Sequence, residues 1–269
     1  MTLIASWVGV DSKKSGPKTA SIYIVSDSRI NWGKGRYSDQ HAKVFGMRKH
    51  PVILGYCGDV LFPYNILNQV VVQADEGILF SATASNEEKF DVIFGKIDLA
   101  LRSYPEEQLA KSFRIICAMR DVDNNFNCYL ICWDIRNGLK KEILTIPPYS
   151  GLVTSQGSGA KEFEDRFCYN YSKRHNNYRT SRAIYQCFTD TLDEIKDHAC
   201  GGVPQVMGLY RKDNAKIFGI VRKGKIFFMG NEVSYFENLK FVEWRNDEFE
   251  RCDPFTLKIL PDAQRQPKS

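Results

Sequence analysis

Residues 24–33 read Ile-Val-Ser-Asp-Ser-Arg-Ile-Asn-Trp-Gly, and residues 42–45 read Ala-Lys-Val-Phe. Asp27 ends one apolar, β-branched stretch, and Lys43 begins another. A lysine at the end of a buried strand needs an opposite charge, which Asp27 can supply. An ordinary ion pair at two strand ends would leave the same pattern, so these residues alone do not establish a catalytic site.

Strands are predicted on both sides of this stretch. Residues 3–10 and 20–25 are joined by a cluster of turn-forming residues and predict a hairpin at the start of the chain. Further strands are predicted at 43–48, 52–57, 113–118, 127–133, 142–146, 151–155, 204–210, 215–221 and 225–229. The strands at 142–146 and 151–155 are expected to continue the sheet begun by 113–118 and 127–133.

Apolar residues recur with a helical period in two regions between these strands. The first region predicts helices at 61–75 and 87–101, and the second predicts helices at 160–175 and 181–198. The alternation of strands and helix pairs indicates one α+β domain, with two sheets and helices on their outer faces. This domain is expected to cover residues 1–230. Residues 231–269 form a C-terminal extension, expected to be irregular and to end in a solvated tail at 262–269.

Composition excludes several classes of function. The 269 residues carry a net charge of +5, from 37 basic and 32 acidic residues, without the basic stripe typical of nucleic-acid binding. No apolar run approaches the ~20 residues of a membrane span, and the N-terminus lacks the features of a signal peptide. A cytoplasmic protein is expected, with its 8 cysteines reduced. The sequence implies no metal and no organic cofactor.

Thr2 is a candidate nucleophile because removal of Met1 would place a free α-amine beside its own hydroxyl. An α-amine has an ordinary pKa of about 7.7–8.0 and can accept the hydroxyl proton near neutral pH. Lys43 would lower the proton affinity of that hydroxyl, and Asp27 would keep the lysine charged and oriented. A small second residue is also common merely because it permits removal of Met1.

In this arrangement the sequence resembles the proteasome β-subunit family of N-terminal nucleophile threonine hydrolases, in particular the bacterial proteasome-like peptidases. The resemblance rests on Asp-Ser-Arg at 27–29 with Gly33, on Lys43-Val44, and on Gly-Tyr-Cys-Gly-Asp at 55–59. Gly-Ser-Gly at 157–159 and Asp-His-Ala-Cys-Gly-Gly at 197–202 are similar to further family motifs. The resemblance covers roughly residues 2–229. It implies a four-layer αββα sandwich of two antiparallel sheets flanked by helices.

The resemblance implies a role for each matching residue. Gly58 would hold the oxyanion through its backbone N–H, while Ser158 and Asp197 would orient the Thr2 amine. Cys200 and Gly201 would support the site. Substrate would contact the loop and pocket formed by Arg29, Ile30, Asn31, Gly33, His41, Phe45 and Tyr56.

The chain departs from the family pattern at several positions. The first hairpin carries an insertion at 13–19, Asn31 stands where threonine is usual, and Cys200 stands where serine is usual. Because a thiol is a poorer hydrogen-bond donor than a hydroxyl, support for the Thr2 amine should be weaker on the side of Cys200.

The leading hypothesis is a threonine peptidase that cleaves peptides or unfolded proteins and assembles into a homo-oligomeric ring, with an ATP-dependent unfoldase or another regulator as a further partner. A catalytically silent structural subunit and a small-amide or acyl hydrolase are the alternatives. The presence of Thr2, Asp27 and Lys43 argues against a silent subunit. Neither nucleic acid nor a membrane is an expected partner.

Overall fold

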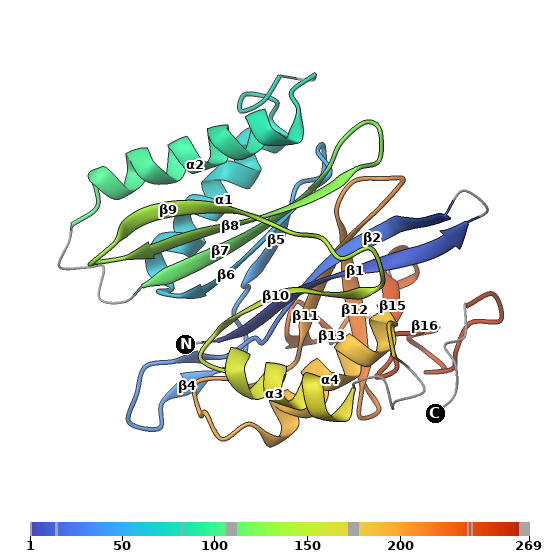
Figure 1. The fold of residues 1–269 in the computed structure, drawn as a ribbon. Coiled ribbons are helices and arrows are strands. Elements are labelled where there is room, and N and C mark those ends of the chain that lie inside the picture. The colour runs from blue at the N-terminus through green and yellow to red at the C-terminus, as the bar shows by residue number, and fades with distance from the viewer. Residues whose placement is uncertain are drawn as a thin grey trace.

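The computed structural model describes residues 2–13, 16–81, 83–105, 112–171, 178–235, 237 and 239–263. Within these residues, most strands belong to two sheets, and four α-helices lie outside them (Figure 1). The α+β class predicted from the sequence is therefore confirmed.

The larger sheet contains the N-terminal hairpin. Its described strands run in the order β10 (Gly151–Gly157), β1 (Leu3–Lys13), β2 (Gly16–Ser26), β11 (Gln205–Tyr210), β12 (Lys216–Arg222), β13 (Lys225–Phe228) and β14 (Asn231–Glu232). Two short strands, β15 (Glu243–Arg245) and β16 (Arg251–Cys252), join the sheet through β12. The pairs in this sheet are antiparallel except β12 with β15.

The smaller sheet is an antiparallel meander of consecutive strands. Its described strands are β5 (Val44–Gly46), β6 (Val52–Gly58), β7 (Phe113–Arg120), β8 (Phe126–Asp134) and β9 (Gly138–Leu144). A separate ribbon pairs β3 (Ile30–Asn31) with β4 (Tyr37–Ser38). This ribbon lies in the segment that joins the two sheets.

The two sheets pack against each other through the alternating side chains of their strands. On β1, Ile4 and Val8 belong to the core shared with the smaller sheet, whereas Leu3 and Trp7 belong to the core beneath the helices. Successive residues of a strand point to opposite faces, so β1 is buried on both sides. This double burial explains why β1 reads as a nearly continuous apolar run.

Each sheet is covered by one pair of helices on its outer face (Figure 1). Helices α1 (Leu61–Asp75) and α2 (Asn86–Arg102) pack on the smaller sheet, and α3 (Ala160–Asn170) and α4 (Ser181–Glu194) pack on the larger one. A capping box between Ser85 and Glu88 begins α2, and the Thr180 hydroxyl accepts from Ala183 N at 3.1 Å to begin α4. None of the helices in the described part of the chain is long and apolar enough to cross a membrane.

The structure corrects two predictions about these elements. Strand β10 does not continue the sheet of β9 but pairs with β1, where Leu3 lies opposite Gly157. Pairing of this kind depends on a strand distant in the sequence, which local patterns do not reveal. The fourth helix ends at Glu194 and not at 198, and the third ends at Asn170, while 172–177 lie outside the described residues.

The C-terminal segment is more regular than the sequence analysis expects. Strands β14, β15 and β16 lie within it, and Trp244 is buried in a small apolar cluster beside β12 and β13. Phe249 inserts between Trp7 and Tyr185, with ring centroids 5.5 Å and 4.9 Å away. The segment is therefore packed onto the larger sheet as far as Ala263; most of the predicted tail lies outside the described residues.

Phe249 should make the C-terminal segment part of the cooperative fold. Because it is 2% exposed among aromatic rings, Phe249→Ala should lower the free energy of unfolding by about 3–5 kcal/mol in urea denaturation. Phe255→Ala is the matched control, since Phe255 is 59% exposed and its removal should change stability by less than about 0.5 kcal/mol. Equal effects of the two substitutions would show that Phe249 adds nothing to the core.

Candidate active site

Thr2, Asp27 and Lys43 meet in the interior where three strand ends converge. Thr2 immediately precedes β1, Asp27 follows β2, and Lys43 precedes β5; none is more than 3% exposed. The Lys43 ammonium donates to Thr2 Oγ1 at 2.9 Å, to Asp27 Oδ1 at 2.7 Å and to the backbone oxygen of Arg29. All three of its protons therefore have acceptors, which is what a buried ammonium requires.

The Asp27 carboxylate is held by backbone groups as well as by Lys43. Leu3 N donates to Oδ1 at 3.3 Å, and Gly201 N donates to Oδ2 at 3.0 Å. Burial raises the pKa of Asp27 above its ordinary value, and the Lys43 ammonium and the two N–H donors counter part of that rise. The carboxylate thus links the start of β1, the end of β2 and the glycine turn before β11.

Two glycines with positive φ shape the turns around Thr2. Gly157 has a φ of 97°, and a Cβ there would lie 2.0 Å from the Thr2 carbonyl oxygen, so no other residue fits without a backbone shift. Gly58 has a φ of 98°, and its Cβ would lie 2.1 Å from the Ser112 oxygen. The Cβ of Cys57 lies 3.6 Å from the position that a Gly157 Cβ would occupy. Residues 57–58 are therefore neighbours of the Gly157 turn, which itself contacts Thr2.

Ser158, Asp197 and Cys200 form a polar cluster next to the start of β1. The Cys200 sulfur lies 3.6 Å from Ser158 Oγ and 3.7 Å from Asp197 Oδ2. Burial raises the pKa of Cys200 to about 12, so the thiol keeps its proton at neutral pH and can donate it in a hydrogen bond. Partial burial works to raise the pKa of Asp197, but hydrogen bonds from Ser158, Ala199 and Cys200 bring it below its ordinary value.

Arg29 and Asn31, expected to contact substrate, are engaged in holding their own loop. Arg29 forms a bidentate ion pair with Asp39 at 2.7 and 2.9 Å and stacks over the ring of Tyr37. Asn31 donates to the backbone oxygen of His198 at 3.0 Å and accepts from Gly33 N at 2.6 Å. Their side chains brace the 27–41 segment against the turn that contains Cys200.

The other residues expected in a substrate pocket differ in their exposure. Ile30 is 8% exposed and Tyr56 only 1%, so the Tyr56 ring lies in the core beneath α1. Phe45 is half-buried, with its ring 6.2 Å from Tyr56, and His41 packs edge-on against Trp32 at 5.7 Å. Of these predicted residues, Phe45 and His41 are therefore the ones that a ligand could reach, beside the exposed Trp32, which the sequence analysis did not name.

Gln205 is a buried polar residue of this region that the sequence analysis missed. Its side-chain oxygen accepts from Lys43 N at 3.0 Å, and its side-chain nitrogen donates to the His41 oxygen. The amide of β11 thereby fixes the backbone that carries Lys43. A glutamine at the start of the apolar strand 205–210 was the available signal, because a buried polar group must be hydrogen-bonded.

Nothing in the described part of the chain groups three or more His, Cys, Asp or Glu side chains as metal ligands. All 8 cysteines are free, and Cys57 is buried with a pKa raised to about 12 by that burial. Cys57 is therefore a neutral packing residue next to Thr2.

Solved structures are similar to this one at low sequence identity. Anbu (ancestral beta-subunit) from Yersinia bercovieri superimposes with a TM-score of 0.53 and 11% identity, over 80% of this chain and 86% of that one. Eukaryotic HslV from Trypanosoma brucei gives a TM-score of 0.48 and 10% identity, over 77% of this chain and 99% of that one. No family model and no curated protein matches the chain. The likeness to Anbu shows a shared fold.

Removal of the Lys43 ammonium should destabilise the protein, because the buried Asp27 carboxylate would lose its opposite charge. We expect Lys43→Met to lower the free energy of unfolding by about 3–5 kcal/mol at neutral pH. Burial already raises the pKa of Asp27, and loss of the ammonium raises it further. When the pKa of Asp27 is higher in the folded than in the unfolded protein, proton binding favours the folded state. This stabilisation is complete below the unfolded pKa of about 3.9 and is lost as pH rises through the folded pKa. Urea denaturation at about pH 7 and pH 5 should therefore show a smaller deficit at the lower pH.

The double variant Lys43→Met with Asp27→Asn is the control for this pH dependence. It lacks the ionisable carboxyl, so its deficit relative to the wild type should not shrink in the same way between the two pH values. A Lys43→Met deficit that grows as pH falls would contradict the assignment of Asp27 as the group that titrates.

Gln205→Leu should destabilise the protein by leaving Lys43 N and the His41 oxygen without their partner. The expected loss is about 1–3 kcal/mol for buried backbone groups, measured by urea denaturation. Gln69→Leu, on the exposed side of α1, is the matched control and should have little effect. Similar losses in the two variants would argue against a specific role for Gln205.

Proposed function

We propose that this chain is a threonine-type peptidase of the proteasome-like family, with Thr2 as the nucleophile after removal of Met1. The observation that carries the proposal is the buried contact of Lys43 Nζ with Thr2 Oγ1 at 2.9 Å and with Asp27 Oδ1 at 2.7 Å. An ammonium against a hydroxyl favours the alkoxide form, because positive charge stabilises the developing negative charge. The fold shared with Anbu supports the same reading.

In the proposed reaction, the Thr2 α-amine accepts the proton from Oγ1 as this oxygen attacks a peptide carbonyl. The carbonyl oxygen becomes an oxyanion, for which the Gly58 N–H is the candidate donor. A preorganised donor of this kind lowers the barrier by about 3–4 kcal/mol. The protonated amine then returns the proton to the leaving amine, which leaves an ester on Thr2.

Water hydrolyses that ester, with the Thr2 amine again as the base, and regenerates the hydroxyl. Ser158 and Asp197 are the proposed orienting groups for the amine. Gly159 N donates to the backbone oxygen of Thr2 at 3.4 Å and so attaches the 157–159 turn to Thr2. This contact supports the proposal that the turn helps to orient the Thr2 amine. Cys200 acts through its contacts with both side chains.

Substrate is proposed to add as an extended strand between the 29–33 loop and the Gly58 turn. Backbone groups would bind it, since Arg29 and Asn31 are occupied by Asp39 and His198. We further propose a four-layer αββα catalytic unit over residues 1–230, an extension over 231–269, and assembly into a homo-oligomeric ring. The two helix pairs on opposite outer faces support the layered arrangement.

The deciding experiment combines intact mass with labelling by an epoxyketone, which reacts with a hydroxyl and a free amine on one residue. The wild type should lack Met1 and carry one label, and Thr2→Ala should carry none. Thr145→Ala is the matched control, because Thr145 is exposed and makes no described side-chain contact. Retained Met1, or labelling that persists in Thr2→Ala, would overturn the proposal.

The same preparations distinguish the alternatives. A chain that loses Met1 but neither takes the label nor cleaves a casein substrate would be a silent structural subunit. A chain that takes the label, stays monomeric in light scattering and cleaves small amides but not casein would be a small-amide hydrolase.

A further inference from the structure

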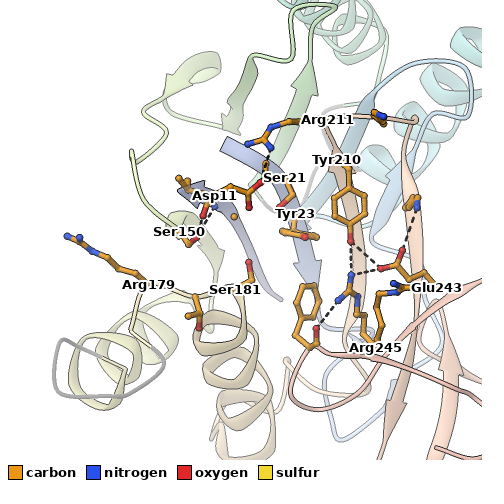
Figure 2. Close-up of a pocket in the computed structure, with 18 of the residues that line it drawn as sticks. Asp11, Ser21, Tyr23, Ser150, Arg179, Ser181, Tyr210, Arg211, Glu243 and Arg245 are labelled. Carbon is orange, nitrogen blue, oxygen red and sulfur yellow. Dashed lines mark hydrogen bonds and ion pairs between the residues drawn. The ribbon is translucent and has the colours of Figure 1, made fainter. Parts of the chain in front are cut away.

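A cavity of about 1010 Å³ is lined by Gly9, Val10 and Asp11, toward the other end of β1 from Thr2. Figure 2 shows the side chains around it. The cavity is bounded by the far ends of β1 and β2, the start of α4 and the C-terminal segment around Glu243 and Arg245. Gly9 lines it, and an extended strand places Gly9 roughly 23 Å from Thr2. The cavity is therefore separate from the candidate active site.

The charged side chains around this cavity have an excess of positive charge. The basic members are Arg179, Arg211, Lys212, Lys216, Arg245 and Arg251, and the acidic members are Asp11, Glu243 and Asp262. Each carboxylate is paired with an arginine of the lining: Asp11 with Arg211, Glu243 with Arg245, and Asp262 with Arg251.

Arg179 and Lys212 remain without an acidic partner among the described residues. Among the described residues, Arg179 lies over the rings of Tyr149 and Tyr178, with its guanidinium 4.2 Å from the Tyr149 centroid. The lining therefore keeps positive charge that its own carboxylates do not neutralise, which favours an anionic ligand.

Two serine hydroxyls converge on one place in the cavity wall. A Cβ on Gly9 would lie 2.6 Å from Ser21 Oγ and 3.3 Å from Ser181 Oγ, so both oxygens lie close to Gly9 and leave no room for a side chain there. Ser21 is 4% exposed, and neither hydroxyl has a hydrogen-bond partner in the described part of the chain. Both residues line the cavity, so each hydroxyl is available to donate a hydrogen bond to a polar ligand there.

The start of α4 adds a third source of attraction for an anion. Thr180 and Ser181, at the N-terminus of this 14-residue helix, line the cavity together with Arg179. A helix N-terminus carries partial positive charge and binds phosphate groups in many proteins. Arg179 has a φ of 58°, a left-handed conformation uncommon outside glycine, and such residues occur often at ligand sites.

We propose that this cavity binds a phosphorylated small molecule. The Ser21 and Ser181 hydroxyls and the α4 N-terminus hold the phosphate, and Arg179 contacts it from the cavity rim. Tyr23 and Phe249 also line the cavity, with only 5% and 2% of their surface exposed. A concave site with few unneutralised charges suits a compact anion better than a polyanionic strand, which requires an extended basic surface.

The test is isothermal titration of the full chain with magnesium-free pyrophosphate, and with ATP, at constant ionic strength. We expect one site per chain for at least one of the two probes. Ser21→Ala and Arg179→Gln should each weaken binding about tenfold, since each removes a hydrogen bond to a charged group. Arg136→Gln is the matched control, because Arg136 is exposed on a turn outside the cavity, and it should bind like the wild type. Circular dichroism melting of each variant checks that the fold is retained.

The proposal is overturned if neither probe binds at millimolar concentration. It is also overturned if binding is equally strong in Ser21→Ala and Arg179→Gln, or equally weakened in Arg136→Gln, because the anion would then occupy other basic side chains. If a single-stranded RNA oligonucleotide binds while neither pyrophosphate nor ATP does, the surface would be assigned to a polymer instead. None of these outcomes depends on peptidase activity, so they are independent of the proposed function.

Discussion

The ion pair of Lys43 with Asp27 is the interaction on which the rest of this structure depends. Two charges that are at most 1% exposed lose almost all hydration, so they persist only where other groups satisfy them. The groups that do so are the Thr2 hydroxyl, the Arg29 oxygen, and the N–H groups of Leu3 and Gly201. Satisfying one pair of charges therefore fixes the relative positions of β1, β2, β5 and the turn before β11.

The residues around this ion pair hold the backbone at Thr2 and Lys43 in place. The Thr2 oxygen lies so near Gly157 that only glycine can occupy that position, and Gln205 joins the Lys43 backbone to β11. Arg29 and Asn31 serve the same end, because their side chains brace a loop instead of extending into solvent. For the proposed peptidase, such bracing would reduce the entropy that Thr2 loses on reaction, which is how preorganised sites gain rate.

Strand β1 connects two regions with different chemistry. Its first residues belong to the buried Lys43 centre, and its far end, with Gly9 and Asp11, lines the cationic cavity. The C-terminal segment forms one wall of that cavity through Glu243 and Arg245 and is anchored beneath it by Phe249. The C-terminal segment thus belongs to the fold and contributes side chains to the cavity.

The sequence by itself determined the α+β class, most strands and helices and the trio Thr2, Asp27 and Lys43, because local periodicity and short motifs record burial and turn chemistry. Helix α1, for example, has the predicted bounds. Only the tertiary structure decided that β10 pairs with β1, that Tyr56 is buried, that Gln205 supports Lys43, and that Ser21 and Ser181 converge on Gly9. Each of these depends on residues far apart in the chain. Contacts of that kind are set by how strands pair and layers pack, and no local pattern encodes them.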